Sequence, residues 1–338
     1  MLMLMSMRMR VLALTVLIVA GGAVSGVGAY LKLGVVVGGR LIGIEWTNQP
    51  IQYRVTTRDV PGVTAGQLQT ALDGAFAEWA RPAGVAVSSQ FAGFTSADPF
   101  VDDGWSVIGF DARPELDRTL GAATFVFDDV TGEILESDIF LNSAFEWSVA
   151  SNGEPGRFDV ESILVHEVGH LLGLGHSALG ETELIASGRR VTGKRAVMFP
   201  IAYGRGSIED RTIEADDIAG ITDIYGTAAA RRALGAIVGR VTLNGAGVFG
   251  AHVTAFNPAT GDLVAGFTLN SQGDFVIAAM KPGIYIVRAE PLDDADLESF
   301  FEDDTPININ FQVGYHATHV AVPPGGAGQA IEIKVRAK

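Results

Sequence analysis

The chain has 338 residues, enough for two domains of ordinary size. Its hydrophobic fraction of 48% excludes an intrinsically disordered protein. Nucleic acid and anionic membrane surfaces would repel its formal net charge of −15, so neither is expected as a partner.

Residues 1–29 have the layout of a secretory signal peptide. Arg8 and Arg10 precede an apolar run, and small residues lead to a predicted cleavage site after Ala29. The alternative is an uncleaved N-terminal anchor, because residues 11–31 carry no charge and are long enough to span a bilayer. We favour cleavage, which predicts a secreted, extracellular protein with no stable membrane association afterwards. A short segment, residues 30–45, follows the signal.

Cysteine is absent from the whole sequence. Disulfides and lipid-modified cysteines are therefore excluded. An exported protein without disulfides suggests a bacterial source.

Residues 46–227 predict an α+β domain. The alternation of apolar and polar residues in 51–55 indicates a strand. Thr64 and Gln67 form a capping box that opens a helix, whose apolar stripe ends at Trp79. Short apolar or alternating runs predict four further strands of one mixed sheet, at residues 85–91, 106–110, 122–127 and 137–142.

An acidic turn, residues 128–133, lies between two of these strands. With Asp102 and Asp103 it offers oxygen ligands of the kind that Ca²⁺ prefers. Acidic turns are more often simply solvated. We therefore favour a solvated turn and keep a structural calcium site as the alternative.

The most specific pattern in the chain runs from His166 to His176. It belongs to a helix predicted to begin near Asp159, so His166 and His170 lie four residues apart on one face and can bind one metal ion. Gly173 lets the chain leave the helix, and His176 can then supply a third ligand. Three imidazoles suit Zn²⁺ and leave its fourth position open, as in a catalytic site.

This pattern, H-E-x-x-H-x-x-G-x-x-H, is the metzincin motif, which requires a methionine turn downstream. Met198 lies 22 residues past His176, within residues 196–200, where such a turn would belong. Ser177 and residues 213–226 are also similar to one branch of that group. The sequence therefore resembles the matrixins among the metzincin zinc endopeptidases, over roughly residues 45 to 227.

The resemblance implies a zinc endopeptidase that acts on protein or peptide substrates. Glu167 would be the general base, because it lies beside the metal rather than on it. Residues 138–142, which include Phe140, would form the edge strand along which an extended peptide lies. Pro200 and Tyr203 would help to form the S1′ pocket. The cysteine latch that keeps vertebrate matrixins inactive has no counterpart here.

Past the motif, residues 180–194 are polar and predict an irregular loop. A last helix is expected from Glu214, with acidic residues in its first turn, where they favour the helix dipole. Residues 228–234 predict the fraying end of that helix and a linker.

The periodicity then changes, and residues 235–338 predict an all-β sandwich. Strand-like runs alternate with glycine, proline and asparagine turns, in a pattern that resembles the carboxypeptidase regulatory-like, transthyretin-type domain. His316 and His319 are interpreted as surface residues. No pattern identifies a partner for this region.

Two functions follow from these observations. The first is a secreted zinc-dependent endopeptidase. The second is a secreted or surface binding protein in which the β-sandwich carries the role and the zinc site is a retained scaffold. The presence of Glu167 favours the enzyme, because a retained scaffold has no need of a base.

Overall fold

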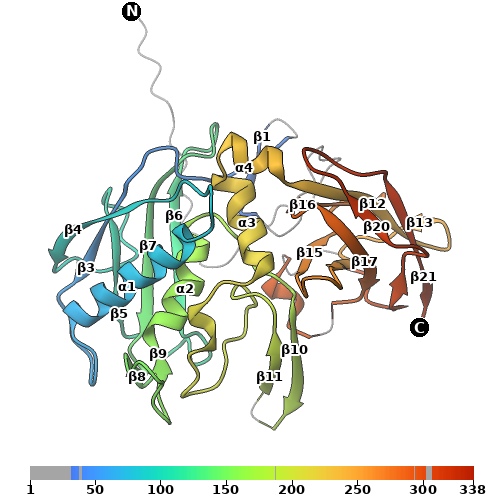
Figure 1. The fold of residues 1–338 in the computed structure, drawn as a ribbon. Coiled ribbons are helices and arrows are strands. Elements are labelled where there is room, and N and C mark those ends of the chain that lie inside the picture. The colour runs from blue at the N-terminus through green and yellow to red at the C-terminus, as the bar shows by residue number, and fades with distance from the viewer. Residues whose placement is uncertain (1–31, 38–39, 187, 293, 302–306) are drawn as a thin grey trace, which may run out of the picture.

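The structure is a computed structural model that describes residues 32–37, 40–186, 188–292, 294–301 and 307–338 (Figure 1). The predicted signal peptide and its cleavage site lie outside the described residues. Among the residues that are described, no helix is long and apolar enough to cross a membrane.

The N-terminal half is built on one mixed sheet with the strand order β4-β3-β5-β7-β6. Its first four strands are parallel, and β6 runs antiparallel to β7. The mixed sheet is thus confirmed, although the strand predicted at 85–91 begins only at Ser89. The strands are β3 (Ile51–Thr56), β4 (Ser89–Thr95), β5 (Ser106–Asp111), β6 (Gly121–Phe127) and β7 (Ile134–Asn142).

The prediction that residues 138–142 form the edge of this sheet is wrong. Strand β7 is an interior strand, paired with β5 on one side and with β6 on the other. Phe140 is fully buried in it, so its side chain is not accessible to a substrate. On this side of the sheet the edge is β6, because the chain forms β6 first and then returns in a hairpin, which places β7 between β6 and β5.

Three main helices accompany the sheet: α1 (Ala65–Ala80), α2 (Val160–Leu171) and α3 (Ala215–Tyr225). The predicted capping box at Thr64 and Gln67 is present, and the apolar stripe of α1 is buried. Trp79 links α1 to α2, because its Nε1 donates a hydrogen bond to the carbonyl of Val165 at 2.7 Å. Residues 228–234, predicted as a frayed end and linker, instead contain a separate short helix, α4 (Ala228–Ala233).

Residues 180–194 are not the irregular loop that was predicted. They form a hairpin of β10 (Gly180–Ile185) and β11 (Gly188–Lys194). None of the hairpin's described residues is buried, so its sequence lacks the apolar alternation of a strand with one buried face. Shorter two-stranded ladders join β1 (Gly34–Val37) to β2 (Arg40–Gly43) and β8 (Trp147–Ser148) to β9 (Phe158–Asp159).

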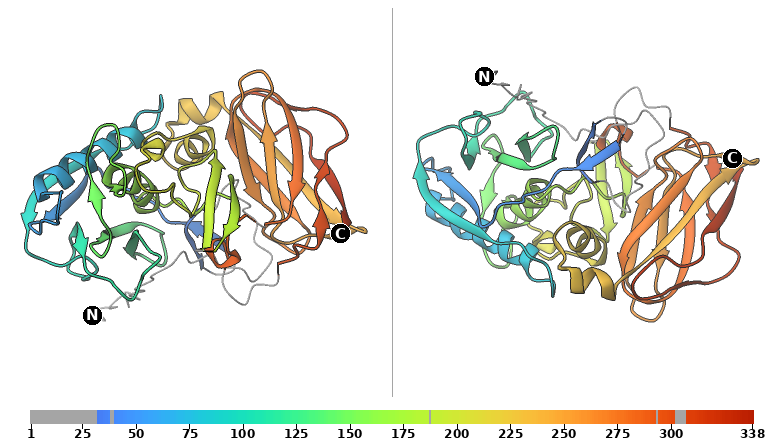
Figure 2. Two further views of the ribbon diagram at one scale, coloured as in Figure 1. Left: turned by 90° about the horizontal axis from the view of Figure 1, so that it is seen from below. Right: turned by 90° about the horizontal axis from the view of Figure 1, so that it is seen from above.

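The C-terminal region contains two five-stranded sheets. Figures 1 and 2 show them beside the N-terminal half, with α3 and the β10–β11 hairpin facing them. Their strands are β12 (Gly235–Leu243), β13 (Ala246–Gly247), β14 (His252–Phe256), β15 (Leu263–Phe267), β16 (Asp274–Met280), β17 (Gly283–Glu290), β18 (Phe311–Gln312), β19 (Gly314–Tyr315), β20 (Val320–Val322) and β21 (Ile331–Ala337).

Candidate metal centre

Helix α2 carries two histidines of the motif on one face. Its first turn is capped by Asp159, whose carboxylate accepts a hydrogen bond from the Ser162 N–H at 2.8 Å, as the sequence predicted. Gly169 lies between the two histidines, where a Cβ would come within 2.3 Å of the Met198 sulfur. Only glycine therefore lets α2 pack this closely on the methionine.

The glycine of the motif, Gly173, turns the chain out of the helix. Gly173 has a φ of +91°, and a Cβ there would approach the Ile44 carbonyl oxygen to 2.4 Å. A side chain would be strained at this position and would also collide with the backbone. The turn directs the chain back, so that His176 reaches the two histidines of α2.

The three imidazoles converge through their Nε2 atoms. His170 Nε2 lies 3.1 Å from His166 Nε2 and 3.2 Å from His176 Nε2. Tetrahedral zinc with Zn–N bonds of 2.0–2.1 Å would hold its ligand nitrogens about 3.3 Å apart, so this spacing suits zinc.

Each imidazole is oriented from behind by a backbone carbonyl. His166 Nδ1 donates to the Val197 carbonyl, and His170 Nδ1 donates to the Leu174 carbonyl, both at 2.8 Å. In His176 the acceptor is Ser299, at 2.6 Å. An Nδ1–H bound in this way leaves the lone pair on Nε2, which is the tautomer that a metal requires.

Burial keeps these rings neutral. It lowers the pKa of His170 to about 3 and that of His176 to about 4, and it holds the pKa of His166 well below its ordinary value. Unfavourable interaction with a neighbouring imidazole adds to the shift for His166 and His170. Neutral imidazoles keep the lone pairs that bind a metal ion, so the chemistry of the donor set fits zinc.

Glu167 lies directly beside the first ligand and is buried. Burial raises the pKa of its carboxyl to about 8. Its Oε2 has no hydrogen-bond partner among the described residues, and Gly121 leaves space where a Cβ would come within 3.0 Å of Oε1. A buried carboxyl with one unpartnered oxygen is suited to exchange a proton with a bound molecule.

The turn around Met198 lies beneath the triad. Asp217, in the first turn of α3, accepts hydrogen bonds from the N–H groups of Val197 at 2.8 Å and Met198 at 3.2 Å. The Val197 carbonyl in turn orients His166, so α3 supports a ligand through this turn. From the sequence alone, this aspartate is expected only to interact favourably with the helix dipole.

The neighbouring Asp216 joins the motif to the C-terminal region. Its carboxylate accepts from the Ser177 hydroxyl at 2.6 Å and from the Ala265 N–H of β15 at 2.8 Å. Ser177 directly follows the third ligand, and its N–H donates to the Met198 carbonyl at 2.9 Å. Of these two adjacent carboxylates of α3, Asp217 therefore supports the methionine turn, and Asp216 links the residue after the third ligand to the C-terminal region.

A cleft of about 810 Å³ opens over the triad and Glu167. We call it the triad cleft. Strand β6 lines one side of it, and Pro200 and Tyr203, both predicted to contact substrate, line another. Ser299 and two acidic residues of its turn, Asp296 and Glu298, also line the cleft.

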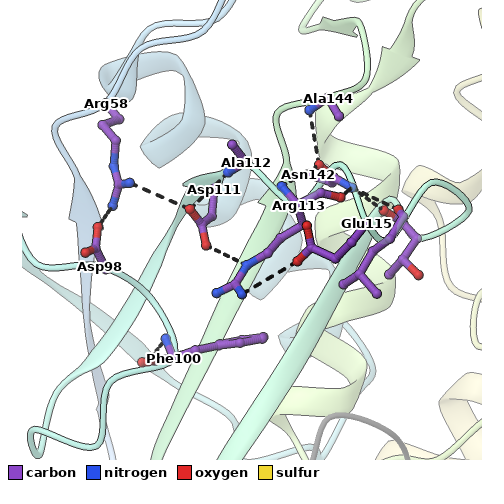
Figure 3. Close-up of polar contacts among 12 residues, drawn as sticks. Arg58, Asp98, Phe100, Asp111, Ala112, Arg113, Glu115, Asn142 and Ala144 are labelled. Atoms are coloured by element: carbon purple, nitrogen blue, oxygen red, sulfur yellow. Dashed lines mark hydrogen bonds and ion pairs between the residues drawn. The ribbon is translucent and has the colours of Figure 1, made fainter.

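The loop that leads into β6 is shaped by Asn142, at the end of β7 (Figure 3). Its side-chain NH₂ group donates to the carbonyls of Arg113, Leu116 and Thr119 at 2.9–3.1 Å. Figure 3 also shows Arg113 paired with Asp111, at 2.8 Å. These contacts hold the loop where it enters the edge strand of the cleft.

A calcium site receives no support from the described residues. Burial raises the pKa of Glu136 to about 7 and that of Asp138 to about 6, and the charge of Asp103 adds to both shifts. In the turn at 128–133, Asp128 accepts hydrogen bonds from two N–H groups of the same turn. The histidine triad is the one convergent group of three or more candidate ligands in the described ranges. Structural calcium therefore stays the alternative to a solvated turn.

The other histidines lie in the C-terminal region. His252 is buried and its Nδ1 lies 3.1 Å from Glu290. His319 is exposed, whereas His316 is partly exposed and bonded to the Thr318 carbonyl.

Comparison with known proteins agrees with this geometry. The sequence profile of the Matrixin family matches residues 45–226. The chain is 28% identical to Metalloendoproteinase 1-MMP of Arabidopsis thaliana over 54% of this chain and 44% of that protein. It is 26% identical to human Matrilysin, over 54% and 59% of the two chains. It is 35% identical to Metalloendoproteinase 5-MMP of Arabidopsis thaliana, over 36% of this chain and 31% of that protein.

The alignment with the first of these relatives therefore spans less than half of that protein's length. The family match, in contrast, covers more than half of the present chain and includes all three histidines and the methionine turn. On these grounds the chain belongs to the matrixin family.

Proposed function

We propose that this protein is a secreted zinc endopeptidase with His166, His170 and His176 as zinc ligands and Glu167 as general base. The observation that carries the proposal is the convergence of three neutral imidazoles beside a buried carboxyl, at the floor of a cleft bordered by an edge strand. A retained binding scaffold would have no use for that carboxyl.

When bound, zinc supplies a Lewis acid that activates water and polarises the scissile carbonyl. Glu167 takes a proton from the attacking water and delivers it to the leaving amine. Burial raises the pKa of this carboxyl from its ordinary value toward the working pH, where a group exchanges protons most efficiently. The Nδ1 contacts of the three histidines keep the rings in the ligating tautomer.

The peptide would lie along β6. This strand pairs only with β7 among the described residues, so its outer backbone groups are free to bind an extended chain. Gly121 and Ala122 at its start line the triad cleft. This assignment replaces the interior strand that contains Phe140.

The pocket after the scissile bond would be apolar. Pro200, Ile201 and Ala202 line the cleft beside the triad, and Tyr203 follows them. Cleavage should therefore favour an apolar residue immediately after the scissile bond. The preference should be graded, because one methylene is worth only about 1–3 kcal/mol in such a pocket.

The assignment of the C-terminal region as a transthyretin-type β-sandwich is likewise a proposal. It is supported by two five-stranded sheets with fully buried side chains such as Ile237, Val253 and Val287. Secretion rests on the signal-like residues 1–29.

An unbiased peptide-library digest with the full chain tests the proposal. Cleavage should stop when a chelator removes zinc and should return when zinc is added back. A protein that binds zinc stoichiometrically and cleaves no peptide in a broad library would favour the binding-protein alternative.

A further inference from the structure

Residues 294–301 belong to the C-terminal region but reach the metal centre. Leu297–Ser299 forms a short 3-10 turn, η2. The Ser299 carbonyl accepts the hydrogen bond from His176 Nδ1 at 2.6 Å. The Phe300 ring stands nearly perpendicular to the His176 ring, at an interplanar angle of 82° and a centroid distance of 6.4 Å.

This segment is attached to the β10–β11 hairpin. Thr182 donates to Asp294 twice, from its N–H at 3.0 Å and from its hydroxyl at 2.6 Å. Arg189 forms an ion pair with Asp296 at 3.5 Å. The turn is therefore held at its start by polar contacts with a hairpin that directly follows the zinc motif.

At its end the segment is held by apolar packing. Phe300 and Phe301 are both buried and share one cluster with Phe199 and Phe267. Phe301 packs on Phe249 and Phe267, whereas Phe300 packs on Phe267 and also faces His176. The carbonyl of Ser299 is thus fixed by anchors on both sides.

The three ligands differ in the origin of their Nδ1 partners. His170 uses a carbonyl 4 residues away and His166 one 31 residues away, but His176 uses one 123 residues away. We propose that residues 294–301 are a positioning element for the third zinc ligand. The Ser299 carbonyl holds the ligating tautomer of His176, and Phe300 restricts rotation of its ring. The C-terminal region is then a component of the metal centre, an inference that rests on the proposed zinc function.

The test compares two full-chain variants, Phe300→Ala and Phe301→Ala. Each removes one buried phenylalanine from the same cluster, but only Phe300 faces His176. Circular dichroism establishes the folded fraction, and competition with a chelator gives the zinc dissociation constant. Groups that orient metal ligands typically change metal affinity by about 10- to 100-fold, and we expect a loss of that size for Phe300→Ala only. Phe301→Ala loosens the end of the segment but keeps the ring that faces His176, so it should lose clearly less affinity in its folded fraction.

A second pair decides the question if Phe300→Ala does not fold. Thr182→Val removes the hydroxyl that binds Asp294. Thr192→Val is the control on the facing strand of the same hairpin, where the hydroxyl bonds only to Glu181 among the described residues. We expect weaker zinc binding for Thr182→Val alone, with a smaller loss than in Phe300→Ala because the Thr182 N–H still binds Asp294. The absorption spectrum of the Co²⁺-substituted protein should shift in the same variants.

The outcomes separate the two proposals. Folded Phe300→Ala that binds zinc as tightly as the wild type overturns the positioning role and leaves the proposed enzyme intact. If it does not fold, wild-type zinc affinity in Thr182→Val has the same meaning. Equal loss of affinity in Phe300→Ala and Phe301→Ala also overturns it, because the effect would then be general packing. Wild-type protein that fails to bind zinc overturns the proposed function itself.

Discussion

The two ring nitrogens of His176 contact very different parts of the chain. Its Nε2 lies beside Nε2 of His170, 6 residues away, whereas its Nδ1 donates a hydrogen bond to the Ser299 carbonyl, 123 residues away. We call the convergence of the three Nε2 atoms the near side of the site, and it depends on one helix and one glycine turn. We call the contact between His176 Nδ1 and Ser299 the far side, and it exists only when the C-terminal region is folded against the N-terminal half. Ligand identity is thus a local property here, and ligand orientation is a tertiary one.

The largest effect should follow from breaking the near side. His170→Ala removes the central ligand, whose Nε2 lies within 3.2 Å of both others. Because the described residues bring only three protein ligands together, we expect loss of bound zinc and no detectable peptidase activity. Metal analysis of the purified protein measures this. His316→Ala is the control, since His316 contacts a carbonyl of the C-terminal region instead. Full zinc occupancy in His170→Ala would refute the ligand assignment.

The next effect separates catalysis from metal binding on the same near side. Glu167→Ala leaves all three imidazoles, so zinc content and fold should stay close to the wild type. Loss of a general acid–base group should lower the rate by a factor of about 10² to 10⁴. Steady-state kinetics on a cleaved library peptide measures this. Wild-type activity with zinc in place would show that another group is the base.

A smaller effect should come from the tertiary support of His166. Asp217→Ala removes the acceptor of the Val197 and Met198 N–H groups, so the turn that orients His166 is released. We expect zinc affinity to fall by about 10- to 100-fold. Chelator competition gives the value. Asp223→Ala, at the other end of α3, loses an ion pair with Lys32 and should keep its zinc. Equal zinc affinity in the two variants would contradict the supporting role.

The smallest effect concerns pH and the contact between the two halves. Burial, with the charge of Asp217, raises the pKa of Asp216 from 3.8 to about 7. Between these values the folded protein binds a proton that the unfolded chain releases, so the free energy of unfolding should fall as the pH rises from about 4 to 7. Asp216→Asn cannot ionise and should show a shallower decline in denaturant titrations across this window. An unchanged slope would mean that Asp216 does not titrate there.

Much of the near side was predictable because its signals are local. The spacing of His166, His170 and His176 specifies one face of a helix and one turn, and it was sufficient to predict the donor set that the fold assembles. The capping residues Thr64 and Asp159 begin their helices as predicted, since a cap depends on neighbours within three residues. The mixed sheet followed from short apolar runs of the same local kind.

The tertiary structure alone decided the rest. The residues of a single strand do not determine its position in the sheet. The prediction therefore places residues 138–142 at the edge beside the site, whereas β6 occupies that position. The β10–β11 hairpin lacks an apolar alternation because none of its described residues is buried. Ser299 offers a backbone carbonyl, which every residue possesses, so no side-chain pattern marks it as a partner of His176. A sequence reveals which groups can bind zinc, but contacts across 123 residues depend on how the whole chain packs.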